Sequence, residues 1–226
     1  MVKHFAPLDT IGCESKMNDL TEPKQNLRIR RLRRSELPTN TIQLARYLIG
    51  KTVVRETPGG RMSGRIVETE AYPVGDAAGH AFTGRSAANN SLFLKRGTAY
   101  VRFTYGSCWL FNVAGEKPGV GAGVLIRALE PVEGVPMMQR NRRTSAMREL
   151  ARGPGRLSEA MAIDKAFDGI DLCAPGSLLW LGAPVRPAKG VIGVSVRIGI
   201  AKDAQRRLRF YERGSRFVSG PVRLSP

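Results

Sequence analysis

RIVETEAY, residues 65–72, completes a strand that the pattern predicts from Met62 to Tyr72. Successive side chains of a strand point to opposite faces, so Glu68, Glu70 and Tyr72 are expected to share one face. The opposite face then takes Val67, Thr69 and Ala71. Two carboxylates beside an aromatic ring are costly to bury unless they have partners. This face is therefore a candidate site, and simple pairing of both carboxylates with the many arginines is the alternative.

The segments around this strand predict the rest of the fold. Asn40 and Thr41 precede an apolar-periodic stretch that Gly50 ends, which predicts a short helix over 42–49. Further strands are expected over residues 51–55, 100–105, 109–113, 124–129, 192–200 and 207–211, and further helices over 137–150 and 158–166. Because strands and helices do not alternate regularly, the order favours one mixed α+β domain with a largely antiparallel sheet over a parallel α/β sheet.

The charge of the chain indicates its partner. Thirty-six Lys and Arg against 19 Asp and Glu give a formal net charge of +17 over 226 residues. Such an excess attracts polyanions, so nucleic acid is the expected partner, ahead of an anionic membrane surface. Ribosomal and architectural proteins share this balance, so charge alone does not make the protein an enzyme.

Residues 1–35 are predicted to form a mobile basic arm, and residues 36–226 one catalytic domain. The arm ends in an arginine-rich run over residues 28–34, which serves either as a solvated charged face or as a phosphate-contacting segment.

Cysteine and histidine usage argues against a metal or a disulfide framework. The three cysteines are widely spaced, and His4 and His80 are the only histidines. No run of about 18 apolar residues is present, so no membrane span is predicted. We therefore expect no cofactor and no metal, and a place in the reducing cytoplasm, associated with the nucleoid.

Several ordered blocks resemble one known family. They are GRIVETEAY, Gly79-His80, KRGTAYVRFTYG, FNVAG, VLIRALEP, GPGRLSEAMAIDKAFDGIDL and LRFYERGS. Together they resemble the alkyladenine (3-methyladenine) DNA glycosylases of the mammalian type, from about Thr41 to Val218. The resemblance implies a curved antiparallel sheet with peripheral helices and a protruding, DNA-inserting hairpin.

The activity that this resemblance implies is base excision repair by a monomer. The enzyme would flip an alkylated or deaminated purine (3-methyladenine, 7-methylguanine, hypoxanthine or ethenoadenine) out of duplex DNA and hydrolyse the N-glycosidic bond. The product would be an abasic site without strand cleavage.

The resemblance also assigns catalytic roles. Glu70 matches the general base that activates water, whereas Glu68 matches a motif residue without that role. Arg127 matches the arginine that helps to hold this water and the adjacent phosphate. A backbone carbonyl near Ile198 matches the third partner of the water. Residues 208–215 match a motif that we treat as structural.

Substrate contacts follow from the same resemblance. Tyr72 and His80 match two walls of the base pocket, and Asn112 matches the residue that crowds the exocyclic amine of guanine. Tyr105 matches the wedge that fills the gap in the duplex. Spacing alone leaves open whether this ring inserts into DNA or folds back onto the core.

Arg102 departs from the family pattern, which typically has a tyrosine that stacks on the flipped base. A guanidinium can also stack on a base. It repels a cationic alkylated purine, so we expect a preference for neutral lesions such as hypoxanthine or ethenoadenine over 7-methylguanine. Alternatively, Arg102 turns to a phosphate, and Phe103 or Phe82 replaces the missing ring.

Three other activities compete with hydrolysis. The main one is a catalytically weak or inactive relative that only binds lesions. The second is an RNA-binding or ribosome-associated basic protein, which leaves the ordered blocks unexplained. The third is a lyase that uses Lys95 or Lys51 as an amine nucleophile.

Overall fold

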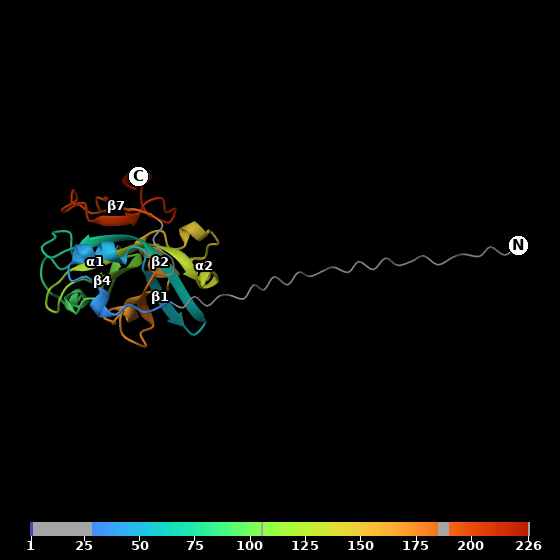
Figure 1. The fold of residues 1–226 in the computed structure, drawn as a ribbon, viewed down its shortest axis with the longest axis horizontal. Coiled ribbons are helices and arrows are strands. Elements are labelled where there is room, and N and C mark those ends of the chain that lie inside the picture. Colours follow the sequence, from blue (N-terminus) through green and yellow to red (C-terminus); the bar gives the residue numbers. More distant parts are fainter. Residues whose placement is uncertain (2–28, 105, 185–189, 226) are drawn as a thin grey trace.

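A single antiparallel sheet organises the chain, seen in the computed structural model of Figure 1. The structure describes Met1 and residues 29–104, 106–184 and 190–225. Within these residues the sheet has eight strands, and six of them follow the order β3-β4-β5-β2-β1-β6. Strand β8 pairs with β2, and β7 pairs with β8. The sheet is curled and carries helices at its periphery, so the predicted α+β class is confirmed.

The bounds of the elements match most of the predicted strands. The strands are β1 (Thr52–Thr57), β2 (Gly60–Tyr72), β3 (Ala99–Thr104), β4 (Cys108–Ala114), β5 (Gly123–Glu133), β6 (Leu179–Gly182), β7 (Ile192–Ser195) and β8 (Arg209–Glu212). The α-helices are α1 (Thr41–Leu48), α2 (Val135–Arg142) and α3 (Pro154–Ala160). Short 3-10 turns cover Arg34–Glu36, Asn90–Phe93, Met147–Glu149, Lys165–Phe167 and Val222–Leu224.

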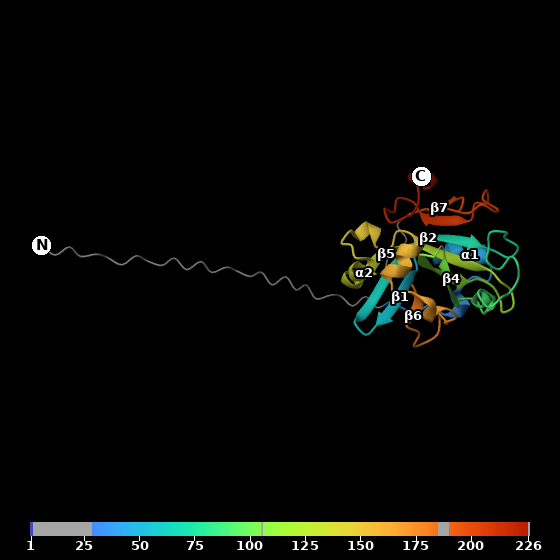
Figure 2. The same cartoon turned by 180° about the vertical axis from the view of Figure 1, so that it is seen from behind.

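Strand β2 is the centre of the molecule. Its first half pairs with β1, its second half pairs with β8 on the same edge, and β5 follows the opposite edge. Figures 1 and 2 both show β7 and the C-terminal segment (residues 209–225) beside β2. Within this segment, β8 pairs with Glu68 to Glu70 in the second half of β2. The C-terminal segment therefore reaches the strand that carries the two candidate carboxylates.

Helix α1 forms as predicted because its ends and its apolar face are both specified. The side chain of Asn40 accepts hydrogen bonds from the backbone nitrogens of Ile42 and Gln43, which caps the helix. Leu44 and Leu48 are buried against the sheet.

The predicted bounds of the other two helices were wrong. Helix α2 ends at Arg142 and not at residue 150, because Arg143 takes a left-handed conformation (φ 50°) that stops it. Helix α3 begins at Pro154 and not at residue 158. Proline fits the first turn of a helix, whose backbone N–H groups have no partner within the helix.

Two strand predictions also need correction. The strand expected over 192–200 ends at Ser195, and residues 197–199 lie in the loop that follows. Strand β6 was not predicted; its residues Leu179–Gly182 pair with β1.

Three irregularities interrupt the pairing of β2 with β5, and two of them flank Glu68. Ile66 lies opposite Leu129 and Glu68 opposite Ala128, so Val67 is an extra residue; Arg127 is the corresponding extra residue of β5. The alternation predicted for β2 therefore fails at Val67. This side chain joins a small cluster with Ala128, Tyr211, Phe217 and Val218 instead of the main core that takes Ala71.

The described part of the predicted arm is packed on the body. Leu32 is buried, and its backbone nitrogen donates to the carbonyl of Leu181 in β6. The guanidinium of Arg31 lies 4.3 Å from the ring centre of Trp180. The folded body therefore begins before residue 36, while residues 2–28 lie outside the described residues.

Candidate active site

A buried cluster of two carboxylates and two arginines lies where β2, β5 and β8 meet. Glu68, Glu70 and Arg209 have no exposed surface, and Arg127 is 7% exposed. The Nε atoms of Arg127 and Arg209 lie 2.9 Å and 2.6 Å from Oε1 of Glu68. The irregular pairing brings both carboxylates and Arg127 to one side of the sheet.

Glu70 is held at both of its oxygens. Its Oε1 lies 3.1 Å from Nη1 of Arg127 and accepts a hydrogen bond of 2.8 Å from the backbone nitrogen of Ile198. Its Oε2 accepts a hydrogen bond of 2.9 Å from the hydroxyl of Tyr72. A backbone carbonyl near Ile198 was expected at the site, whereas the contact with Glu70 is made by the backbone amide of Ile198.

Glu68 is saturated by structural partners. Besides the two arginines, it accepts a hydrogen bond of 2.6 Å from the backbone nitrogen of Ser219. The other guanidinium nitrogens of Arg209 donate hydrogen bonds to Ser195, Ser219, Leu224 and Ser225. Glu68 therefore ties β2 to the C-terminal segment and orients Arg127.

Arg127 is cationic despite its burial. Burial acts to lower its pKa, but the charges of Glu70 and Glu68 outweigh this effect and raise the pKa above its ordinary value.

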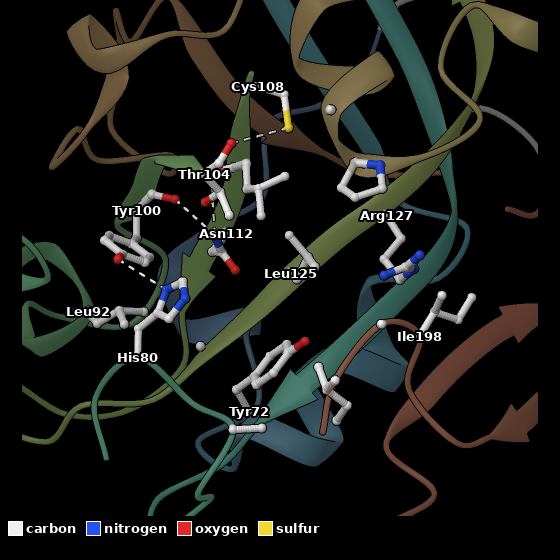
Figure 3. Close-up of a pocket in the computed structure, with 17 residues that line it drawn as sticks. Tyr72, His80, Leu92, Tyr100, Thr104, Cys108, Asn112, Leu125, Arg127 and Ile198 are labelled. Atoms are coloured by element: carbon white, nitrogen blue, oxygen red, sulfur yellow. Dashed lines mark hydrogen bonds between the residues drawn. The ribbon is translucent and has the colours of Figure 1, made fainter. Parts of the chain in front are cut away.

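A cavity of about 530 Å³ opens beside this cluster, and we call it the base pocket. Its wall includes five residues expected from the sequence, namely Tyr72, His80, Asn112, Arg127 and Ile198 (Figure 3). Glu70 lies behind Tyr72 and Arg127 and does not itself line the space. The pocket therefore has the size and mixed polarity of a small-molecule site, with a carboxylate at its back.

Tyr100, which was not predicted from the sequence, lines the pocket next to His80. Tyr100 is fully buried, and its hydroxyl lies 3.2 Å from Nδ1 of His80 (Figure 3). Burial and the nearby charge of Arg102 lower the pKa of His80 to about 4. His80 is therefore neutral at pH 7, with one ring nitrogen as a donor and the other as an acceptor. Because side chains two apart on a strand share a face, the expected place of Arg102 in the pocket could have predicted Tyr100 there as well.

Arg102 was expected in the base pocket, but it is not among the residues that line the cavity; only its position along β3 relates it to the pocket. It stands between Tyr100 and Thr104, which both line the pocket, and side chains two apart share a face. Its charge acts on Tyr100 as well as on His80. Neither aromatic residue considered as a substitute lines the pocket: Phe103 packs against Trp109 at 5.0 Å, and Phe82 is 52% exposed.

Asn112 is oriented by the backbone of the hairpin. Its Nδ2 donates to the carbonyls of Tyr100 (3.3 Å) and Leu110 (3.4 Å). The amide oxygen is left to face the pocket on the side of Leu125 (Figure 3). Tyr105, the expected wedge at the tip of this hairpin, lies outside the described residues.

A second buried ion pair supports Tyr72 and was also missed from the sequence. The guanidinium of Arg197 lies 4.6 Å from the ring centre of Tyr72, and its Nη1 lies 2.8 Å from Asp76. Both charged side chains are fully buried. Burial and the charge of Glu70 raise the pKa of Tyr72, so its hydroxyl is a donor at neutral pH.

Two features are absent from the described residues, a metal-binding cluster and a membrane-spanning helix. These residues contain no group of three or more His, Cys, Asp and Glu side chains placed to hold a metal ion. Nor does the described part of the chain include a helix long and apolar enough to cross a bilayer.

A buried carboxylate paired with arginine lies beside a pocket with aromatic walls in a strongly basic protein, and this combination suits an enzyme that acts on nucleic acid. The family model of methylpurine-DNA glycosylases matches residues 35–216. The chain belongs to this family, and it is a monofunctional DNA glycosylase, a hydrolase of DNA repair whose substrate is DNA.

Relatives agree over nearly the whole body of the chain. A protein of Mesorhizobium japonicum is 61% identical over 191 residues, which cover 84% of this chain and 91% of the relative. One from Paraburkholderia phytofirmans is 50% identical over 201 residues, covering 89% and 93%. One from Rubrobacter xylanophilus is 44% identical over 178 residues, covering 79% and 92%. All three carry the provisional name 3-methyladenine DNA glycosylase.

Proposed function

We propose that this enzyme removes alkylated or deaminated purines from duplex DNA, with Glu70 as the general base that activates water. The observation that carries the proposal is the placement of Glu70. It is a fully buried carboxylate, held by Arg127 and by the amide of Ile198, directly behind the wall of the base pocket.

The reaction balances with a single water molecule. Water attacks C1′ of the flipped nucleotide, and the bond from C1′ to the purine nitrogen breaks with its electron pair leaving on the base. The proton of the water passes to Glu70, whose negative charge also stabilises the oxocarbenium-like transition state. A neutral lesion departs as an anion and takes up a proton from solvent, and Glu70 returns its proton to solvent. The products are a free base and an abasic site.

An amine nucleophile has no support at the pocket. Lys51 lies over the ring of Tyr47, and Lys95 pairs with Asp171. Neither is among the residues that line the base pocket. Simple hydrolysis is therefore favoured over lyase chemistry.

Arg102 and His80 support a preference for neutral lesions. A cationic guanidinium between Tyr100 and Thr104 on β3 repels a base that carries a positive charge, such as 7-methylguanine. Neutral His80 offers one ring N–H to an acceptor on the edge of a purine, and both hypoxanthine and ethenoadenine present such acceptors. We propose these two neutral purines as the preferred substrates.

The test is single-turnover excision on duplexes that carry hypoxanthine, ethenoadenine or 7-methylguanine. Wild-type protein should release the neutral bases faster, and Glu70→Gln should lose base release by at least about 10²-fold while it still binds the lesion. Glu133→Gln, at the far end of β5, is the matched control and should keep full activity.

Arg102→Tyr should raise the rate on 7-methylguanine relative to hypoxanthine. An unchanged ratio would contradict the proposed lesion preference. Selective lesion binding without release by the wild-type protein would contradict hydrolysis and favour the lesion-binding alternative.

A further inference from the structure

A second cavity adjoins the base pocket at the tip of the β3–β4 hairpin. Its volume is about 590 Å³, and it shares Cys108, Pro154 and Gly155 with the base pocket. We call it the outer pocket. It lies between the hairpin and helices α2 and α3, and the chemistry assigned so far does not use it.

Side chains of strand β3 line both pockets, but from opposite faces of the strand. Tyr100 and Thr104 of β3 line the base pocket, whereas Phe103 lines the outer pocket. Phe103 is 47% exposed and packs against Trp109, with ring centres 5.0 Å apart and planes inclined by 58°. An aromatic pair of this kind leaves one ring surface free for a stacking partner.

The charge of the outer pocket suits an anion. Its lining contains Arg142, Arg152 and Arg156 against Glu159. Glu149, outside the lining, pairs with Arg152 and Arg156, so three arginines face two carboxylates and keep a net positive charge. Arg142 pairs with Glu159 through Nη1, yet its buried Nε has no hydrogen-bond partner. A buried donor without a partner is costly, so a ligand that supplies an acceptor would be favoured.

Exposed aromatic rings beside arginines are the features with which proteins bind unstacked nucleotides. A flipped lesion leaves its former pairing partner without a base pair, and an unpaired base costs less to take out of the stack than a paired one. We propose that the outer pocket is a second DNA-binding site that receives the base opposite the lesion, with Phe103 as the stacking surface and the arginines at its phosphate. This inference rests on the proposed base flipping. It places the lesion in the base pocket and the opposite base in the outer pocket, on either side of the β3–β4 hairpin.

A double-mutant cycle between protein and DNA tests it. Binding is measured in Glu70→Gln protein, so that the lesion stays intact, on hypoxanthine duplexes with thymine or an abasic analogue opposite the lesion. Phe103→Ala should weaken binding to the thymine duplex about 10-fold, within the range reported for base–aromatic stacking. It should leave binding to the abasic duplex nearly unchanged.

Phe82→Ala is the matched control, because it removes an equally exposed ring that does not line the outer pocket. It should show no coupling to the opposite base. Phe103→Leu, which keeps the apolar bulk without the ring, guards against a loss of folding and should show the same coupling as Phe103→Ala.

Two outcomes overturn the inference. Equal loss on both duplexes means that Phe103 does not contact the opposite base, and coupling only to an abasic analogue at a flanking position means that another nucleotide fills the pocket. Either result, with wild-type protein still releasing hypoxanthine, rejects this inference alone. Absence of release from every lesion would instead reject the proposed function.

Discussion

The two oxygens of Glu70 are in different situations. Oε1 is occupied by Arg127 and by the amide of Ile198, and these contacts fix the carboxylate. Oε2 contacts only the hydroxyl of Tyr72 among the contacts described. In the proposed mechanism the attacking water therefore approaches Oε2, where it competes with the hydroxyl of Tyr72, a residue that also lines the base pocket.

Tyr72→Phe separates these two roles, because it keeps the ring and removes only the competing hydroxyl. A typical hydrogen bond contributes about 1 kcal/mol net, so freeing Oε2 should raise the single-turnover rate by up to about 5-fold. The measurement is excision of hypoxanthine under enzyme excess. A fall of tenfold or more would show that the hydroxyl takes part in catalysis.

His80 gives a prediction in pH. The ordinary pKa of a histidine is about 6.5, and that of His80 is lowered to about 4 by burial and by Arg102. A lowered pKa means that the unfolded chain binds the proton more tightly. The contribution of His80 to the free energy of unfolding is therefore complete above pH 6.5 and is lost as the pH falls through about 4.

NMR titration of the two histidine rings checks this value directly. His80 should titrate near pH 4, and Arg102→Gln should move its midpoint upwards by removing a nearby positive charge. His4 serves as the internal reference, because the substitution should not shift it. A midpoint of His80 near 6.5 in the wild-type protein would contradict the environment described.

At the scale of the elements, close packing of β7 on β8 holds the C-terminal segment over the carboxylates. Gly193 pairs with Tyr211, and a Cβ atom at Gly193 would lie 2.3 Å from the Tyr211 ring. Tyr211 is buried and cannot swing into solvent. The guanidinium of Arg209 lies 4.8 Å from the centre of the same ring. Because Arg209 also pairs with Glu68, it links the packing of Tyr211 to the buried carboxylate.

Gly193→Ala should therefore destabilise the protein by about 1–3 kcal/mol, as overpacking of a core does. Urea denaturation followed by tryptophan fluorescence measures the change. Gly59→Ala is the control, since a Cβ there would meet no atom closer than 3.7 Å. Equal stability of the two variants would mean that β7 moves freely away from β8.

Local patterns predicted the elements well where the signal itself was local. The cap at Asn40 and the glycine turn before β2 defined α1 and the first hairpin. The irregular pairing at Val67 and Arg127 was not predictable in this way, since an extra residue in a strand looks like any other strand residue. The same holds for Arg209 and Arg197, whose carboxylate partners lie more than 100 positions away in the sequence. The resemblance to a family, and not the spacing, supplied the roles of Glu70 and Arg127.

At the scale of the whole molecule, the positive charge is carried by the folded body. Residues 2–28 contain four Lys and Arg and four Asp and Glu, so the whole excess of 17 charges lies in residues 29–226. The basic run that the sequence analysis assigned to an arm is in part anchored on the body. Arg31 contacts Trp180, and Arg34 pairs with Asp171.

Deletion of residues 2–28 therefore tests which part of the chain grips DNA. Affinity for duplex DNA falls with salt by a slope of about 0.9 per phosphate neutralised, so the slope counts phosphate contacts. Because the deletion leaves the net charge unchanged, we expect the same slope and the same affinity for undamaged duplex between about 50 and 200 mM salt. Arg156→Gln, in the outer pocket, should reduce the slope by about one. A lower slope after the deletion would show instead that the cations of residues 2–28 bind phosphates while their acidic neighbours face away.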